Sequence, residues 1–340
     1  MDKCTVNRLE CFEDTIRSAQ MPADERSRFS RYCDFIYYPS SITPGLTLAM
    51  RICKPEQPGY ILATTHGWHM TIPAFEEYSR PCSSYLYVEV DMRGRAYSQG
   101  QQDCNGWELY DVIDAIEYVK KHYAEYILDP DVVYFDAGSG GGGNAMAIAC
   151  KFPDYFSHVS ALCGISDYAL WYDNDSVGEF RDEMDIWIGP RSNDTAYRAR
   201  SGASLVQNLC SPMCIVHGET DFRVPSEHSR RFIAAAEAAG NGDLIRYWQI
   251  PGVGTNAHWG NATPEQLACI EQFCEEGRCA NRIPVDIPRK GKMLAGGYLI
   301  TKKFSVILKN LDAIAEVTYD LDSGLLQVSG AEVVHAAFHS

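Results

Sequence analysis

The sequence predicts an α/β fold, in which a mostly parallel sheet is flanked by helices. Short, nearly continuous apolar runs, such as residues 60–65 and 85–90, are typical of strands buried on both faces of a sheet. Helical patterns alternate with these runs, as the crossover connections between parallel strands require. The chain has 340 residues and is 46% hydrophobic, which fits a globular protein large enough for more than one domain.

The elements follow from their hydrophobic periods. Residues 5–20 carry Leu9, Phe12 and Ile16 on one stripe, which predicts a short amphipathic lead-in helix. Apolar runs then predict strands at 35–38, 46–52, 60–65, 85–90, 132–135, 158–163, 213–216 and 244–250. Apolar residues at helical spacing, or small residues in one case, predict helices at 107–123, 144–150, 226–239 and 264–276.

The alternation stops between about residues 167 and 203, where aromatic side chains stand among many acidic ones. This segment is typical of a helical lid inserted into a sheet domain. Its aromatic residues, together with one that follows the last predicted sheet strand, are our candidates for substrate contacts: Trp171, Tyr172, Trp187 and Trp259.

The last sixty residues differ in character from the rest. Prolines and basic residues after Asn281 indicate a linker, and apolar residues then recur with period two over 298–308 and 313–321, with a hairpin turn at 322–324. We therefore predict three regions: a lead-in at 1–32, a catalytic domain at 33–280 and a small β-rich domain at 281–340. So small a β region has a marginal core, so we expect it to pack on the catalytic body or to dock on a partner or second subunit.

Composition narrows the partners and the compartment. The net charge of −15 would repel nucleic acid and anionic membranes, so we expect neither as a partner. No signal peptide or long apolar span is visible, and an odd count of 13 cysteines argues against a disulfide framework. Cys150, Cys163 and Cys214 lie among apolar neighbours, which indicates small buried hydrophobes. We therefore expect a cytoplasmic or other reducing compartment. We also expect no metal, because the cysteine spacings do not match a zinc site, and no cofactor.

The most informative motif is the glycine-rich run 136–144, which lies between a predicted strand and a small-residue helix. A serine on a sharp strand-to-helix turn needs small neighbours, and Ser139 has Ala137 two residues before it and Gly141 two after. A phosphate-binding loop would need a Lys-Ser/Thr pair after the glycines, which is missing. A dinucleotide turn stays open from this run alone, because its glycine spacing is present and Asp167 is the one acid near the expected distance.

Two further loops complete a constellation in a definite order. The run 217–225 follows a strand and carries Asp221, and the run 251–259 follows the last sheet strand and carries His258. Together the three loops resemble those of α/β-hydrolase serine enzymes of the prolyl-oligopeptidase-like and acetylxylan-esterase-like group. The resemblance implies an α/β-hydrolase fold, with Ser139 as nucleophile, His258 as general base and Asp221 as the acid that orients it.

The same resemblance extends to the oxyanion hole and to one more loop. It implies backbone N–H donors at Gly140, directly after the nucleophile, and at Trp68 in the run 66–69. A metal on His66 and His69 finds no third ligand nearby. The run 91–100 is similar to a loop that shapes the floor of the site in this group, with Ala96 in place of a glycine and Ala137 as a second departure.

A serine–aspartate–histidine set serves esters and amides alike, so it leaves the substrate open. We favour a carboxylesterase or deacetylase that acts on an acylated carbohydrate or a small ester. The first alternative is a prolyl-oligopeptidase-like peptidase of aminopeptidase or dipeptidyl type, in which the acidic lid holds a substrate ammonium group. The second is a non-catalytic binding component of a larger assembly, against which the intact constellation argues.

Overall fold

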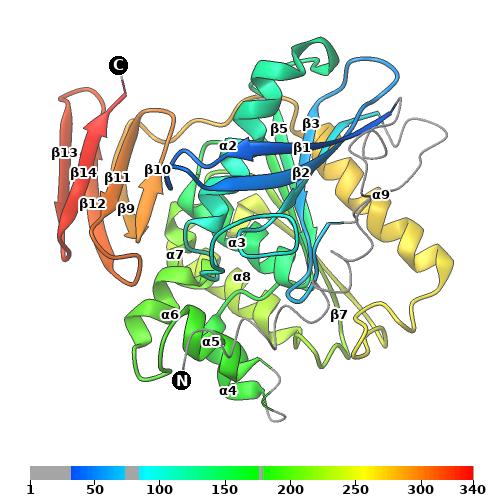
Figure 1. Ribbon diagram of the computed structural model, residues 1–340. Coiled ribbons are helices and arrows are strands. Elements are labelled where there is room, and N and C mark those ends of the chain that lie inside the picture. Colours follow the sequence, from blue (N-terminus) through cyan, green and yellow to red (C-terminus); the bar gives the residue numbers. More distant parts are fainter. Residues whose placement is uncertain (1–31, 73–83, 176–177, 179, 340) are drawn as a thin grey trace. The chain divides into compact units, whose positions relative to one another are not determined.

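The computed structural model describes residues 32–72, 84–175, 178 and 180–339. The predicted lead-in helix lies outside the described residues. The chain forms two compact units, residues 1–137 and 138–340, which are described in turn (Figure 1). The predicted strands and helices of the sheet region are confirmed within four residues at each end.

The first unit contains five strands and one long helix among its described residues. The strands are β1 (Cys33–Pro39), β2 (Thr47–Cys53), β3 (Ile61–Thr65), β4 (Leu86–Asp91) and β5 (Val133–Gly138), which ends at the unit boundary. They lie in the order β1-β2-β4-β3-β5, with β3 parallel to β4 and β5, and with β2 antiparallel to β1 and β4. Helix α2 (Glu108–His122) buries its apolar stripe, and a single turn, η2 (Ala124–Tyr126), follows it.

The loop after β4 contains the run 91–100, and buried polar contacts explain why this run has an acid, an arginine and a serine. Asp91 accepts hydrogen bonds from the N–H groups of Ile72 and Tyr97, and burial raises the pKa of its carboxyl to about 6. Arg93 makes two hydrogen bonds to the Asp111 carboxylate on α2, at 2.6 and 2.7 Å. Ser98 donates to the Asp91 carbonyl oxygen at 2.7 Å. The acid, the arginine and the serine of the motif therefore fasten this loop to α2 and to the strands.

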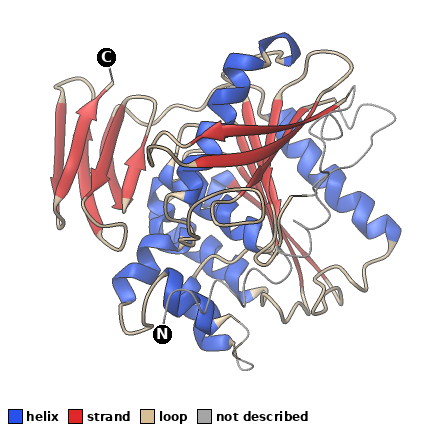
Figure 2. Cartoon of the chain, viewed as in Figure 1, coloured by secondary structure: helices blue, strands red, loops and turns tan. Residues whose placement is uncertain are grey.

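The second unit contains a parallel set of strands, β6 (His158–Leu162), β7 (Met213–Gly218) and β8 (Ile245–Ile250), in that order. The helices that accompany them are α3 (Gly140–Lys151), α8 (Glu227–Ala239) and α9 (Pro264–Ala280), with one turn, η4 (Gly242–Leu244). The insertion between β6 and β7 is helical (Figure 2), as predicted. It comprises α4 (Tyr168–Asn174), α5 (Arg181–Trp187), α6 (Asp194–Arg200), α7 (Gly202–Leu205) and η3 (Val206–Asn208).

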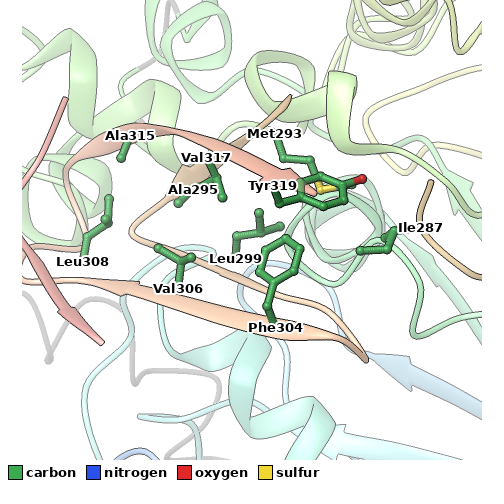
Figure 3. Packing of buried hydrophobic residues seen from close by; sticks show 10 residues of the cluster. All are labelled: Ile287, Met293, Ala295, Leu299, Phe304, Val306, Leu308, Ala315, Val317 and Tyr319. Carbon is green, nitrogen blue, oxygen red and sulfur yellow. The ribbon is translucent and has the colours of Figure 1, made fainter. Parts of the chain in front are cut away.

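The C-terminal region is a separate antiparallel sheet with more strands than predicted. Its strands are β9 (Lys290–Gly296), β10 (Tyr298–Ile300), β11 (Phe304–Leu308), β12 (Ile314–Asp320), β13 (Leu325–Ser329) and β14 (Val333–Phe338). They lie in the order β13-β12-β9-β10-β11-β14 around the apolar core of Figure 3. The predicted hairpin turn at 322–324 is confirmed between β12 and β13.

Two expectations for this sheet are wrong. The single strand expected over 298–308 is a hairpin, because the chain reverses at Thr301, and Leu299 then pairs with Val306 on the core side. The expected linker also ends earlier, because Lys290 begins β9. Its lysines lie on the solvent face, where Lys292 pairs with Glu316 of β12 at 2.9 Å.

The C-terminal sheet packs on the helices of its own unit, as we expected for the body. Lys151 at the end of α3 is 1% exposed, and its Nζ donates to the Gly296 carbonyl at 2.6 Å. Its ammonium group also lies 4.5 Å from the centre of the Tyr298 ring. Asn208 donates to the Leu294 carbonyl at 2.7 Å, and Arg200 pairs with Asp312 at 2.7 Å. Buried polar groups of the body thus have their partners on this sheet.

Two further observations concern the cysteines and the length of the helices. Every cysteine in the described part of the chain is a free thiol, including Cys33 and Cys53, whose Sγ atoms lie 3.4 Å apart across β1 and β2. Within the described residues, the helices are all too short or too polar to cross a bilayer.

Buried histidines in the second unit make its stability depend on pH. His228 is fully buried, and its ring nitrogens find no hydrogen-bond partner among the described residues. Burial, with His217 and Arg231 nearby, lowers the pKa of His228 to about 3. Burial likewise lowers the pKa of His158 to about 4. Both rings are neutral when folded, so the unfolded chain binds more protons below about pH 6.5, and the free energy of unfolding falls as the pH drops from there.

His228→Phe is expected to flatten this acid dependence, because it removes one histidine that must be protonated on unfolding. The slope that it removes approaches about 1.4 kcal/mol per pH unit between pH 6 and 4. At pH 7 the variant should also gain about 1 kcal/mol, because a buried polar group without a partner is replaced by an apolar ring. Urea unfolding at pH 7 and pH 4.5 measures both effects. The exposed His122→Gln is the control, and an unchanged slope in His228→Phe would contradict the prediction.

Candidate active site

Ser139 stands on the turn between β5 and α3. Its backbone φ of 59° and ψ of −122° put a non-glycine residue in a strained conformation, of the kind that clusters at functional sites. The turn is held by hydrogen bonds from the Ser139 N–H to the Leu162 carbonyl, at 2.8 Å, and from the Gly143 N–H to the Ser139 carbonyl, at 3.0 Å. The side chain is partly exposed at the start of α3, as the predicted nucleophile turn requires.

The close approach of α3 and β6 explains the length of the glycine run. A Cβ atom on Gly142 would lie 2.7 Å from both the Leu162 carbonyl oxygen and the Cα atom of Gly164. These are backbone atoms, so a side chain at this position would push the helix off the strand. The sequence pattern pointed to Ala137 and Gly141 as the small neighbours of the serine, and the structure adds Gly142 as a position where no side chain fits.

Asp221 follows β7 in a tight turn and is held by the backbone. Its Oδ1 accepts hydrogen bonds from the N–H groups of Arg223, at 3.0 Å, and Val224, at 3.1 Å. Its side chain is 0% exposed. His217 of β7 secures this turn, because its Nε2 donates to the Val224 carbonyl at 2.8 Å and its Nδ1 bonds Ser229 Oγ at 2.7 Å. The sequence alone did not reveal this role of His217, although the residue begins the run 217–225.

His258 lies on the loop between β8 and α9. Paired backbone hydrogen bonds with Thr255, at 2.9 and 3.0 Å, close a small turn in which His258 has a φ of 50°. The loop packs directly on the Asp221 turn: a Cβ atom on Gly254 would lie 2.0 Å from the Asp221 nitrogen, and the φ of Gly254 is 136°. A glycine is therefore needed there, and it fixes the histidine loop against the acid.

The structure brings Ser139, His258 and Asp221 together in one hydrogen-bonded chain. His258 Nδ1 lies 2.6 Å from Asp221 Oδ2, and His258 Nε2 lies 2.8 Å from Ser139 Oγ. A carboxylate only accepts hydrogen bonds, so Nδ1 carries the proton and Nε2 is free to accept the serine hydroxyl proton. This arrangement can raise the nucleophilicity of Ser139 and stabilise the imidazolium that forms.

The two competing acids have other partners. Glu219 Oε2 accepts the Gly252 N–H at 2.8 Å. Asp167 caps α4 by accepting the Leu170 N–H, and its other oxygen pairs with Arg231 at 2.9 Å. Asp167 is therefore a helix cap, and the dinucleotide alternative loses its only ribose-binding candidate.

The two residues predicted to supply oxyanion donors stand in different units. Gly140 is the first residue of α3, so its N–H has no acceptor within the helix and is available to an oxyanion beside Ser139. Trp68 belongs to the first unit, where its carbonyl accepts a hydrogen bond from Arg95. His66, which was considered as a metal ligand, donates from Nδ1 to the Gly67 carbonyl and accepts the Met92 N–H on Nε2. The contribution of Trp68 stays a prediction.

The aromatic candidates occupy different surroundings. Trp171 is 3% exposed, stacks on Phe180 with ring centres 4.3 Å apart, and donates its indole N–H to the Arg223 carbonyl at 3.1 Å. The Arg223 guanidinium lies over the Phe180 ring, so the insertion meets the acid turn here. Tyr172 packs on Tyr197, and Trp187 is partly buried at the end of α5. Trp259 packs against the apolar cluster around Val216, Ile250, Val253, Ile270 and Cys274.

One group of potential metal ligands lies in the described part of the chain. The ligand atoms of Cys163, His217 and Asp221 all lie within 4.8 Å of one another, and the three residues are buried. The Nε2 of His217 already donates to the Val224 carbonyl, so it presents a proton and not a lone pair toward Asp221. The hydrogen bonding therefore favours a support for the Asp221 turn over a metal site.

A comparison with protein families agrees with this geometry. The model of the prolyl oligopeptidase family matches residues 78–276, which is more than half of the chain. The chain belongs to the prolyl oligopeptidase family. It is therefore a serine hydrolase, and the resemblance that its motifs suggested is confirmed.

Individual relatives include both esterases and peptidases. The esterase LipQ of Mycobacterium tuberculosis is 30% identical over 163 residues, which cover 44% of this chain and 38% of that protein. The acylaminoacyl peptidase of Pyrococcus horikoshii matches 72% of this chain and 41% of its own, with 18% identity and a TM-score of 0.59. The Pyrococcus furiosus esterase PF2001 matches 72% of this chain and 91% of its own, with 13% identity and a TM-score of 0.53. The chain spans about two fifths of the length of the first two, and the structural matches confirm the α/β-hydrolase fold.

Proposed function

We propose that this hydrolase cleaves carboxylic esters through an acyl-enzyme on Ser139, with an acylated carbohydrate or a small ester as substrate. The observation that carries the proposal is the chain of hydrogen bonds from Ser139 through His258 to Asp221. His258 is the general base and acid, Asp221 holds its tautomer, and the Gly140 N–H donates to the oxyanion.

The reaction follows from the positions of these groups. Ser139 Oγ attacks the ester carbonyl carbon while His258 Nε2 takes the hydroxyl proton, and the carbonyl electron pair moves onto the oxygen. Collapse of this tetrahedral adduct breaks the bond to the alcohol, which leaves with the proton from His258. A water molecule then repeats both steps on the acyl-enzyme and releases the acid, restoring the serine.

Three acids of the insertion already have partners, which disfavours the binding of an amine at these positions. Asp173 pairs with Arg191 at 2.9 Å. Asp175 accepts backbone N–H groups at the start of α5, including that of Phe180 at 2.8 Å. Asp185 lies 3.3 Å from the Tyr172 hydroxyl. Each of these carboxylates has a partner, so an ammonium group would have to displace one of them. This supports the esterase over an aminopeptidase whose lid binds the substrate amine.

The relatives support both enzyme classes, but identity and coverage favour the esterases. LipQ, a curated relative with 30% identity, is named an esterase. The Pyrococcus furiosus esterase is matched over most of its length, whereas the acylaminoacyl peptidase is matched over less than half. A prolyl-oligopeptidase-like peptidase remains the second candidate, favoured by the family and by the peptidases among the structural neighbours.

A fluorophosphonate probe and two substrate types test the proposal. We expect one covalent adduct per chain on Ser139, lost in Ser139→Ala and kept in Ser323→Ala, which changes an exposed serine of the β12–β13 turn. We also expect a higher kcat/KM for p-nitrophenyl acetate than for aminoacyl and prolyl anilides. An unlabelled wild type, or equal labelling of Ser139→Ala, would overturn the proposed mechanism. Faster anilide turnover would instead make the chain a peptidase.

A further inference from the structure

Cys163 has a strained backbone beside the acid of the proposed triad. It follows β6 directly and is 1% exposed. Its backbone φ is 48°, a value that residues other than glycine, asparagine and aspartate rarely adopt. Its N–H still bonds the Val216 carbonyl of β7 at 2.9 Å. The next residue, Gly164, packs against the backbone of Gly142 on the nucleophile helix. The turn is thus fixed from two sides, and it aims the thiol inward.

The thiol lies beside the acid turn. Its sulfur faces the Asp221 carboxylate, which lies in the turn after β7. The Sγ and carboxylate oxygen atoms lie within 4.8 Å of each other. Asp221 accepts hydrogen bonds from the N–H groups of Arg223 and Val224 and from the Nδ1–H of His258, and the thiol of Cys163 is a further donor group beside its carboxylate.

We infer that Cys163 is a positioning residue for catalysis, whose S–H donates to the Asp221 carboxylate and fixes the rotation of that group toward His258. The inference rests on the proposed function of the triad. It also gives the strained turn a purpose, because a relaxed residue at this position would not direct its side chain at Asp221. A residue that only filled space would need neither the strain nor a donor.

The surroundings exclude a nucleophilic role for this thiol. Burial, together with the negative charge of Asp221, raises the pKa of Cys163 far above its usual range. The sulfur is therefore protonated, and a thiol in this state is neither a good nucleophile nor a metal ligand. The titratable groups that face Asp221 are His258 from the loop after β8, His217 from β7, His228 from α8 and Cys163 itself.

Three variants separate the donor from the strain and from packing. Cys163→Ala removes the donor and is expected to lower kcat about tenfold with little change in KM, because the Asp221 carboxylate is less well oriented. Cys163→Ser restores a donor and should recover at least half of the activity. Cys163→Gly relieves the strained φ, so it should lose as much kcat as Cys163→Ala while its melting temperature stays above that of Cys163→Ala.

The pH profile gives a readout that a purely structural role would not move. Without the S–H donor, the carboxylate charge acts more fully on His258, which favours the imidazolium. The acidic limb of kcat/KM should therefore move to higher pH in Cys163→Ala, by on the order of half a unit, and return in Cys163→Ser. Equal losses in the alanine and serine variants, or an alanine variant with wild-type kcat and pH profile, would overturn the inference. Fluorophosphonate labelling of Ser139 in the wild type separates this failure from a failure of the proposed function.

Discussion

His258→Ala is expected to lower kcat for ester hydrolysis about 10⁶-fold, as is Ser139→Ala, because the two residues act as a unit. Without the imidazole 2.8 Å from Ser139 Oγ, no group in the hydrogen-bonded chain accepts the hydroxyl proton. The double variant Ser139→Ala/His258→Ala should therefore be no slower than either single variant. Steady-state kinetics with p-nitrophenyl acetate measure all three, and a multiplicative loss in the double variant would contradict the shared mechanism.

Asp221→Asn tests the acid of the same hydrogen-bonded chain. An amide can donate to His258 Nδ1 and stabilise the wrong tautomer, so kcat should fall about 10⁴-fold while the fold is kept. Glu219→Gln is the matched control, because Glu219 stands on the same loop but bonds the Gly252 N–H. It should change kcat by less than about threefold. If Glu219→Gln were the more damaging of the two, the acid of the triad would be misassigned.

The sequence predicted the three reacting residues of the site better than the buried residues that surround them. Ser139, Asp221 and His258 stand on loops after strands, and a motif at each loop reports its chemistry directly. Cys163 is buried, as its apolar neighbours predict, but its contact with Asp221 depends on the pairing of β6 with β7. No local pattern carries that pairing. The only signal was a Cys-Gly pair at the end of the predicted strand 158–163, where a turn was to be expected.

In the C-terminal sheet, the apolar period of the sequence predicted some strands and missed others. Alternation correctly predicted β12, which has one face in the core, and the predicted turn at 322–324 is followed by β13. It missed β9, because Lys290 and Lys292 suggest a linker when their partner strand is unknown. It also merged β10 with β11, because residues 298–308 keep an apolar period of two across a reversal at Thr301. Periodicity reports which residues are buried, whereas the reversal depends on hydrogen bonds across the turn.

Deleting residues 285–340 is expected to leave the rest of the chain unable to fold to a soluble enzyme. The deletion removes the carbonyl partners of Lys151 Nζ and of one Asn208 amide hydrogen bond, both inside the body. It also removes Tyr298, whose ring packs on Phe152 with centres 5.6 Å apart. Losing a hydrogen bond to a charged group costs about 1.5–3 kcal/mol, and together with the apolar surface that the deletion exposes to water this is a large part of the stability of a typical domain. Soluble yield and ester hydrolysis by the truncated chain measure the effect.

A graded variant shows whether the sheet stabilises the body through this contact. Tyr298→Ala should lower the free energy of unfolding by about 3–5 kcal/mol, because it empties a fully buried site between Phe152 and Lys151. Lys290→Ala, on the exposed face of β9, should change it by less than about 0.5 kcal/mol. A truncated chain that stayed soluble and fully active, with Tyr298→Ala as stable as Lys290→Ala, would mean that the sheet does not serve the body. Its strands would then be better explained as a docking surface for a partner or a second subunit.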